Sequence, residues 1–357
     1  KTDEVYQEEV AEDDSLFILY SSGSTGKPKG VIYTHKMLFW NSINTQLRLE
    51  LRSSDKTVGC MPSFHTGGWN VLTTPLLHQG ATIYLTSEFD AETVIDQLVK
   101  TESTIFWGVP TMLKLMEESE SFKDLNLEHI RYFVVGGEAL PVKTIETWRS
   151  KGVLIRQGYG LSEVGPNVTS LHQDDVLRKR GSIGFYNFYI EGKIVNDKLQ
   201  ECKVGEKGEL WLAGPCVTPK YWKNESETQK SREGKWFKTG DIVQKDEEGY
   251  LYIVGRKKEM YISGGENVYP AEVERVLRKH PSIKDVAVVG IADSKWGETG
   301  AALIVPAKED TLTEEEVKSF CKQHLAKFKI PKAIQFAVDL PKNDAGKIDK
   351  RRISQLF

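Results

Sequence analysis

The segment with the clearest chemical character runs from Tyr20 to Gly30 and reads YSSGSTGKPKG. Its hydroxyl groups can donate hydrogen bonds to an anion, its glycines let the backbone approach closely, and Lys27 adds a positive charge. The spacing matches neither a Walker A loop nor a complete G-x-G-x-x-G loop. A phosphate loop is favoured over a flexible Ser/Gly-rich turn, because the segment directly follows an apolar strand. The residues assigned to it are Ser21, Ser22, Gly23, Ser24, Thr25, Gly26 and Lys27.

This segment resembles the phosphate loop of the adenylate-forming superfamily, which includes acyl- and aryl-CoA synthetases, adenylation domains and firefly luciferase. Further segments resemble the family's other motifs and follow in its order. They are GGEA from Gly136, QGYGLSE from Gln157, KTGD from Lys238, GR at Gly255, SGGENVYP from Ser263 and PKNDAGK from Pro341. Any one of them alone is weak, but their order along nearly the whole chain makes chance agreement negligible. Relative to a full family member, roughly the first quarter is expected to be absent, which agrees with a chain that begins at Lys1.

The resemblance implies a two-step activation, in which a carboxylate attacks the α-phosphate of ATP and a thiol then captures the acyl-adenylate. The first step brings two anions together and needs positive charge at the transition state. Lys347 matches the family's catalytic lysine, although by composition alone it reads as a surface lysine. Glu163 is the expected Mg²⁺ ligand, because magnesium prefers carboxylate and phosphate oxygens. The alternative for Glu163 is a helix cap or a surface ion pair.

The nucleotide is expected to bind along the GGEA and QGYGLSE motifs. Tyr159 would stack on adenine, Asp241 would accept hydrogen bonds from the ribose, and Arg256 would reach the ribose or the phosphate. Without the family match, Tyr159 reads as a core aromatic and Asp241 as a turn former. Ser162 replaces the family's usual threonine and keeps a hydroxyl. The remaining residues expected at the nucleotide are Gly137, Glu138, Ala139, Gln157, Gly158 and Gly160.

The acyl group is expected to lie near the segment MPSFHTGGW, which starts at Met61. His65 would flank the carboxylate and the thiol channel, although a lone histidine is more often structural. No acidic residue occurs between Cys60 and Thr86, which disfavours an α-amino substrate. The pocket wall is expected from aromatic and apolar side chains, each of which could equally belong to the core. They are Trp69, Phe106, Trp107, Val109 and Pro110, with Gly137 also expected at the substrate.

Two further glycines and a lysine are assigned to the second step. Gly264 and Gly265 would let a pantetheine arm pass close to the backbone, although they also fit a simple turn. Lys258 aligns with the family's hinge, where a few torsions absorb a domain rotation. The rotation would bring Lys347 to the site for adenylation and remove it for thioester formation.

The elements that must position these residues alternate between strand-like and helix-like segments in the first two-thirds of the chain. Such alternation predicts an α/β domain with a largely parallel sheet, in which Leu16 to Tyr20 is a buried strand. Short β segments follow from about Gly181, and a compact α+β unit follows Lys258. The family implies a large N-terminal domain of layered sheets with a small β-barrel-like part, residues 1–257, and a small mobile α+β domain, residues 258–357.

The composition excludes several functional classes. The chain has 48 basic and 51 acidic residues in 357, so its charge does not favour nucleic acid or an anionic membrane as a partner. The four cysteines have no C-x-x-C spacing, which disfavours a zinc site and a disulfide framework and fits a cytoplasmic location. No apolar run reaches membrane-spanning length, and no signal peptide is visible.

The sequence therefore predicts an AMP-forming acyl-CoA synthetase that uses ATP, Mg²⁺ and coenzyme A. A fatty acid is the first choice of substrate, and o-succinylbenzoate or another aryl acid is the second. Luciferase-like oxygenation and a non-catalytic nucleotide-binding relative are the alternatives from other classes, and a homodimer is left open.

Overall fold

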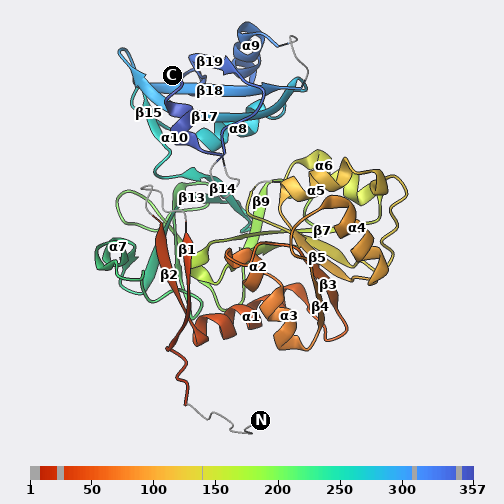
Figure 1. The fold of residues 1–357 in the computed structure, drawn as a ribbon. Helices are drawn as coiled ribbons and strands as arrows, with labels where there is room; N and C mark the ends of the chain where they lie inside the picture. The colour runs from red at the N-terminus through yellow and green to blue at the C-terminus, as the bar shows by residue number, and fades with distance from the viewer. Residues whose placement is uncertain (1–8, 22–27, 139, 308–311, 343–347) are drawn as a thin grey trace. The chain divides into compact units, whose positions relative to one another are not determined.

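The computed structural model describes residues 9–21, 28–138, 140–307, 312–342 and 348–357. The chain folds into two compact units (Figure 1). The first unit is the chain up to Tyr252 without two short segments, Lys207–Glu209 and Gly240–Val243. The second unit is Ile253–Phe357 together with those segments. The division is therefore not made at one point, and a boundary between residues 257 and 258 remains a prediction.

The helices and strands up to the end of β14 are, in chain order, β1 (Ser15–Ser21), β2 (Lys29–Thr34), α1 (His35–Leu49), β3 (Lys56–Gly59), α2 (Thr66–Asn70), α3 (Thr73–Gln79), β4 (Thr82–Leu85), α4 (Ala91–Lys100), β5 (Ile105–Gly108), α5 (Pro110–Glu117), η1 (Glu120–Phe122), β6 (Tyr132–Val135), α6 (Val142–Ser150), β7 (Ile155–Gly160), η2 (Ser162–Val164), β8 (Asn167–Leu171), β9 (Ser182–Tyr186), β10 (Glu191–Val195), β11 (Lys207–Ala213), α7 (Glu225–Lys230), β12 (Arg232–Glu233), β13 (Trp236–Lys245) and β14 (Leu251–Arg256).

The elements that follow are β15 (Tyr261–Ser263), β16 (Glu266–Val268), α8 (Pro270–Leu277), β17 (Ile283–Asp293), β18 (Gly297–Pro306), α9 (Glu314–His324), η3 (Lys327–Lys329), β19 (Ala333–Phe336) and α10 (Lys350–Ser354).

Local sequence explains where several helices begin. The Thr34 hydroxyl accepts a hydrogen bond from the backbone of Met37 at the start of α1, and the Asp90 carboxylate does the same at the start of α4. Proline occupies the first turn of α5 and of α8, where its missing N–H is not needed. Thr313 and Glu316 form a reciprocal capping box at the start of α9.

The large sheet has the strand order β10-β11-β13-β14-β9-β8-β7-β6-β5, and β12 pairs with β13. The pairs β5–β6 and β6–β7 are parallel, whereas β7–β8, β8–β9 and β9–β14 are antiparallel. The prediction of a largely parallel sheet is thus right for β5 to β7 and wrong for the strands beyond β7. Mixed sheets of this kind are common in large domains.

Helices cover both faces of β5–β7, so this part has three layers (Figure 1). Side chains of α4, α5 and α6 pack on one face against Phe106 and Phe133. Side chains of α1 and α3 pack on the other face against Ile105 and Val134. The alternation follows from strand geometry, in which successive side chains point to opposite faces.

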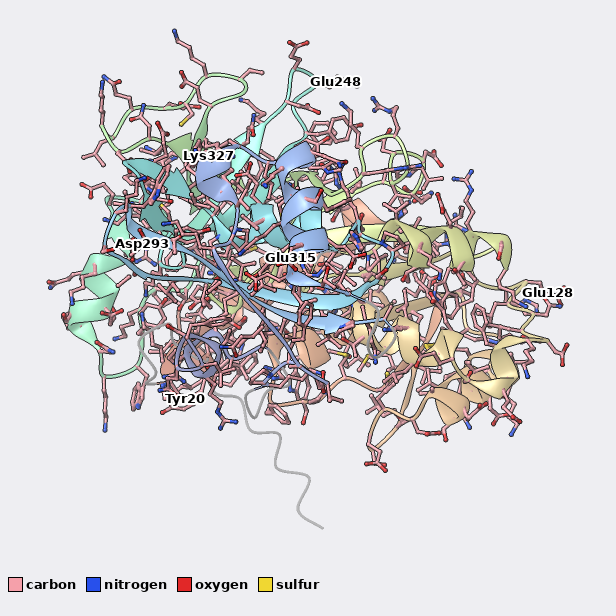
Figure 2. The ribbon with its side chains drawn as sticks, turned by 90° about the horizontal axis from the view of Figure 1, so that it is seen from above. Tyr20, Glu128, Glu248, Asp293, Glu315 and Lys327 are labelled. Atoms are coloured by element: carbon pink, nitrogen blue, oxygen red, sulfur yellow. The ribbon has the colours of Figure 1, made fainter. Side chains whose placement is uncertain are left out.

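Strand β1 differs from its prediction. It pairs antiparallel with β2 in a separate two-stranded sheet and is half exposed rather than buried. Tyr20 near its end is 60% exposed and is labelled at the surface in Figure 2. The five-residue apolar run predicted a buried strand, but no other strand of the described chain pairs with β1.

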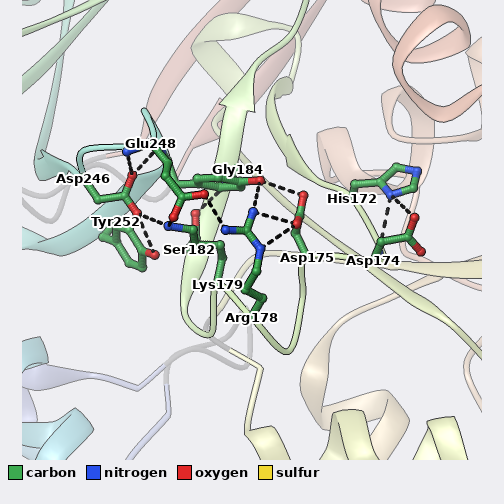
Figure 3. Close-up of polar contacts among 11 residues, drawn as sticks. His172, Asp174, Asp175, Arg178, Lys179, Ser182, Gly184, Asp246, Glu248 and Tyr252 are labelled. Atoms are coloured by element: carbon green, nitrogen blue, oxygen red, sulfur yellow. Dashed lines mark hydrogen bonds and ion pairs between the residues drawn. The ribbon is translucent and has the colours of Figure 1, made fainter.

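A cluster of charges joins the segment after β8 to the turn between β13 and β14 (Figure 3). The Lys179 ammonium pairs with Asp246 at 2.8 Å and also with Glu248. The Arg178 guanidinium pairs with Asp175 at 2.9 Å and with the same Glu248. Within the first unit, the cluster thereby fastens this turn, just before β14, to the segment that follows β8.

The second unit contains a five-stranded sheet in the order β16-β15-β18-β17, with β19 parallel to β18. Helices α8 and α9 pack on one face through a cluster that includes Val273 and Val317. The other face is covered by Leu340 and by Ile353 of α10. The described helices of the whole chain include none long and apolar enough to span a membrane. The mixed α/β architecture, with a large sheet-rich part followed by a smaller unit, confirms the predicted fold class.

Candidate functional site

The predicted phosphate loop connects β1 to β2, and the structure describes both of its ends. Ser21 and Lys29 are paired residues of the hairpin, so they form its base. The Ser21 hydroxyl donates a hydrogen bond of 3.5 Å to Glu163 Oε1. The Lys29 ammonium pairs with Glu227 and lies 5.2 Å from the centre of the Tyr221 ring. The loop base is therefore next to the carboxylate predicted to bind magnesium.

Tyr221 orients that carboxylate. Its hydroxyl donates a hydrogen bond of 2.9 Å to Glu163 Oε1, and its backbone bridges to Val31 of β2. Burial raises the pKa of Tyr221 well above its usual value, and the Glu163 charge raises it further. The phenol therefore keeps its proton and acts as a donor. Sequence reasoning missed this residue, because the two partners are 58 positions apart.

A second buried tyrosine ties the predicted acyl segment to the Glu163 segment. The Tyr33 hydroxyl is 2.8 Å from Thr66 Oγ1 and donates a hydrogen bond of 2.5 Å to the Ser162 carbonyl. Burial raises the pKa of Tyr33, so its hydroxyl stays protonated. Because Tyr33 can donate only one proton, Thr66 is the donor in the other contact. Tyr33 was also missed, since the apolar strand VIYT gives no sign of such a role.

The segment from His65 to Gly68 lies against the end of β5. His65 precedes the first turn of α2, and its ring packs against Phe64 with centroids 4.7 Å apart. The Trp107 indole donates a hydrogen bond of 2.9 Å to the Gly67 carbonyl. A Cβ atom added at Gly68 would lie 2.3 Å from the Pro62 carbonyl oxygen, so this turn requires glycine.

The structure separates the predicted pocket residues into two groups. Phe106 is fully buried between Phe133 and the helices of the first core cluster, so it is a core residue. Trp107 and Val109 are half-buried, and Trp69 is 42% exposed. Strand alternation explains the difference, because Phe106 and Trp107 point to opposite faces of β5.

The GGEA motif lies beside β5 and β7. A Cβ atom at Gly137 would be 3.5 Å from a methyl of Val109, and one at Gly136 would be 2.8 Å from the Gly158 carbonyl oxygen. Gly137 has a φ of 88°, which favours glycine. Glu138 is exposed. The structure therefore brings Val109, Gly137 and Gly158 together, as a shared nucleotide and acyl site would need.

The QGYGLSE motif runs along the end of β7 and into η2. Gly160 leaves no room for a side chain, because a Cβ atom there would be 1.6 Å from the Pro166 carbonyl oxygen. Tyr159 is half-buried and pairs with Thr169 of β8. The buried Gln157 Oε1 accepts no hydrogen bond from the described residues, and such an acceptor suits a donor on a bound ligand.

The described residues contain no cluster of three or more histidine, cysteine, aspartate or glutamate side chains that could hold a metal ion. A site made only of protein ligands is therefore not formed by this part of the chain. Magnesium needs few protein ligands when phosphates supply the other oxygens. Glu163 fits that role, since its half-buried carboxylate adjoins the base of the predicted phosphate loop.

The site residues predicted from the later motifs belong to the second unit. Asp241 is buried and pairs with Arg256, with 2.6 Å between Oδ1 and Nε. Lys258 lies in the turn between β14 and β15. Gly264 and Gly265 both have positive φ, 62° and 87°. A side chain at Gly264 would collide with the Trp296 ring at 2.3 Å, whereas the space beside Gly265 is open. Packing against Trp296 thus accounts for the first glycine without a ligand.

Several predicted residues lie outside the described part of the chain. They are Ser22, Gly23, Ser24, Thr25, Gly26, Lys27, Ala139 and Lys347. Their assigned roles remain predictions.

The chain matches known families over most of its length. Residues 1–222 match the family described as AMP-binding enzyme, and residues 272–347 match the AMP-binding enzyme C-terminal domain. A feruloyl-CoA synthase of Amycolatopsis sp is 34% identical over 98% of this chain and 71% of its own. A long-chain-fatty-acid–CoA ligase of Mycobacterium tuberculosis is 37% identical over 98% of this chain and 69% of its own. A 2-succinylbenzoate–CoA ligase of Bacillus cereus is 37% identical over 100% and 73%.

Solved structures give the same relationship. The o-succinylbenzoate CoA synthetase of Bacillus subtilis in complex with its acyl-adenylate has a TM-score of 0.88, with 34% identity over 96% of this chain and 70% of that one. The same enzyme with ATP and a magnesium ion has a TM-score of 0.87, with 34% identity over 95% and 70%. The chain belongs to the AMP-binding enzymes, and within them to the AMP-forming acyl-CoA ligases.

Proposed function

We propose that this chain adenylates an apolar carboxylic acid with ATP, releases pyrophosphate, and transfers the acyl group to coenzyme A. The observation that carries the proposal is the position of Glu163, whose carboxylate accepts hydrogen bonds from Ser21 and Tyr221. A magnesium ligand placed at the base of a phosphate loop suits a nucleotide whose β- and γ-phosphates leave together. Glu163 would hold the ion together with phosphate oxygens, and the ion would neutralise part of the phosphate charge.

The proposed substrate is a fatty acid, and o-succinylbenzoate or another ring-bearing acid is the second choice. Val109 adjoins Gly137, Trp107 adjoins Gly136, and no acidic residue occurs between Cys60 and Thr86 to pair with an ammonium group. These features support an apolar acid. The relatives named above act on alkyl and aryl acids at similar identity, so their names do not separate the two choices.

The site residues keep their proposed roles. Lys347 would bridge the substrate carboxylate and the α-phosphate, and His65 would flank the carboxylate. Asp241 and Arg256 would contact the ribose, while Tyr159 would stack on adenine. Lys258 would serve as the hinge between residues 1–257 and 258–357. A cytoplasmic location is proposed as well, supported by four free cysteines in the structure.

The test is pyrophosphate release across a panel of carboxylic acids, with and without coenzyme A. We expect release to depend on the acid, and thioester to form only when coenzyme A is present. Equal release without any acid would contradict the proposal. Thioester formation with unbranched alkyl acids and not with aryl acids would decide between the two substrates.

Lys347→Ala provides the mechanistic test. It should remove most acid-dependent pyrophosphate release but leave thioester formation from supplied acyl-adenylate largely intact. Lys322→Ala, an exposed lysine of α9, is the matched control and should leave both steps unchanged. Equal loss of both steps in Lys347→Ala would contradict the assigned role. Light scattering of the purified chain would test the homodimer that the sequence left open.

A further inference from the structure

Lys350 connects three parts of the second unit that lie far apart in the sequence. Its ammonium is 2.6 Å from Glu259 Oε2 and 2.9 Å from Glu274 Oε1. The Lys350 side chain is 23% exposed and that of Glu274 is 8% exposed. Burial by itself would lower the pKa of Lys350, but the two carboxylates raise it, so the group stays charged. An ammonium held by two carboxylates in a largely buried position is costly to disrupt.

The contact with Glu274 passes around one edge of the sheet. Glu274 belongs to α8, which packs on one face, whereas Lys350 begins α10, which packs on the other face. Glu274 Oε1 also accepts a hydrogen bond of 2.8 Å from the backbone of Val288 in β17, the last strand in the sheet order. The pair therefore protects a sheet edge and fastens the two helices to it.

The contact with Glu259 reaches the residue that follows the predicted hinge at Lys258. Before the hinge, the backbone N–H of Lys257 donates to the Gly240 carbonyl at 2.9 Å, and Arg256 pairs with Asp241. After the hinge, Glu259 is held by Lys350. The chain on the two sides of Lys258 is thus anchored to different elements, β13 before it and α10 after it.

Lys350 also adjoins a base formed by the described residues on either side of 343–347. Lys342 and Ile348 form an antiparallel bridge, and the backbone of Asp349 donates a hydrogen bond of 2.8 Å to the Pro341 carbonyl. Leu340 and Ile353 anchor this base in the core, where they are 3% and 0% exposed. Lys350 lies two positions after the bridge, so it ties a fixed base to the hinge side of the unit.

We propose that Lys350 is a positioning residue for the adenylation step. Through Glu259 it makes the base of the Lys347 segment turn together with the chain that leaves the hinge. This inference rests on the proposed function, in which Lys347 is needed for the first step and not for the second. Without the pair, the chain that leaves the hinge at Glu259 is no longer held to this base, and Lys347 reaches the reacting groups less often.

Two variants test the inference, with both half-reactions measured separately. Lys350→Met should lower acid-dependent pyrophosphate release roughly 10- to 100-fold, which is the loss expected from small misplacements of a catalytic group. Glu259→Gln leaves Lys350 paired with Glu274, so the fold is kept while the link to the hinge side loses its charge. It should lower the same rate roughly three- to tenfold, since charge-assisted hydrogen bonds are about twice as strong as neutral ones. Thioester formation from supplied acyl-adenylate should change less than about twofold in either variant.

Glu314→Gln is the matched control, because it removes the charge from another Glu–Lys pair of the same unit, with Lys318 in α9. It should leave both half-reactions unchanged, and Lys350→Arg should restore most of the adenylation rate. If the wild-type chain is active, two results for Glu259→Gln would overturn the inference. One is an adenylation rate equal to that of wild type, and the other is an equal loss of both half-reactions. A wild-type chain that releases no pyrophosphate with any acid would instead overturn the proposed function on which the inference rests.

Discussion

Tyr221→Phe isolates the hydrogen bond that orients the proposed magnesium ligand. The substitution keeps the ring, which lies 5.2 Å from the Lys29 ammonium, and removes only the hydroxyl that donates to Glu163 at 2.9 Å. The second donor to the same oxygen, the Ser21 hydroxyl, is at 3.5 Å and contributes little orientation. The loss therefore falls almost entirely on one hydrogen bond.

The magnitude follows from the charge of the acceptor. A hydrogen bond to a charged group contributes about 1.5–3 kcal/mol. Glu163 is half-buried, so water replaces part of the lost interaction and the lower end of that range applies. About 1.4 kcal/mol corresponds to a factor of ten. We expect the magnesium concentration for half-maximal pyrophosphate release to rise roughly tenfold.

The assay is pyrophosphate release at saturating acid and ATP over a magnesium titration, with a thermal unfolding curve for each variant. Tyr84→Phe is the control, since Tyr84 lies on β4 and is 38% exposed. It should leave the magnesium requirement unchanged. A folded Tyr221→Phe variant with the wild-type magnesium requirement would refute the role assigned to this hydrogen bond.

Three further predictions concern stability and reactivity. Lys179→Met should lower the unfolding temperature at pH 7, because the hydrogen bonds from Lys179 and Arg178 lower the pKa of Glu248 and their stabilisation is present while that carboxylate is charged. The difference in unfolding temperature from wild type should shrink as the pH falls below about 4. A difference that persists at that pH would argue against the charge effect. Gly264→Ala should reduce the free energy of unfolding in urea by about 2–4 kcal/mol, because Gly264 has a positive φ and the new Cβ atom would collide with Trp296. Gly265→Ala should reduce it by only about 1 kcal/mol, because Gly265 has a positive φ but open space beside it. Equal losses would contradict the packing argument. The four cysteines are buried, and burial raises the pKa of each thiol. A thiol reagent at pH 8 should therefore label none of them before the chain unfolds. Rapid labelling of the native chain would contradict the buried positions.

Much of the secondary structure could be predicted from local pattern. The predicted alternation of strands and helices is found, for example, in β5, α5, β6 and α6, which follow one another in the chain. Apolar periodicity and end signals are local properties, so a single sequence carries them. The pairing of strands is not local, and the antiparallel strands beyond β7 were missed for that reason.

The candidate site shows the same division. The ordered motifs identify the family and name Glu163, Asp241 and Lys347 as residues for its chemistry, because the order of motifs is a property of the chain itself. The tyrosines that contact Glu163 and its neighbour Ser162 are not marked by any motif. Tyr33 meets the Ser162 carbonyl across 129 positions, and Tyr221 meets Glu163 across 58.

The ordered motifs were sufficient to identify the class of reaction and the residue types that could perform it. Folding of the whole chain places Phe106 in the core and Trp107 against the Gly67 turn, and it brings two carboxylates from separate elements to Lys350. The physical reason is that a side chain's role depends on which face of a strand it occupies and on which distant atoms fill the space around it. Those neighbours are set by packing of the whole chain, and no short stretch of sequence contains them.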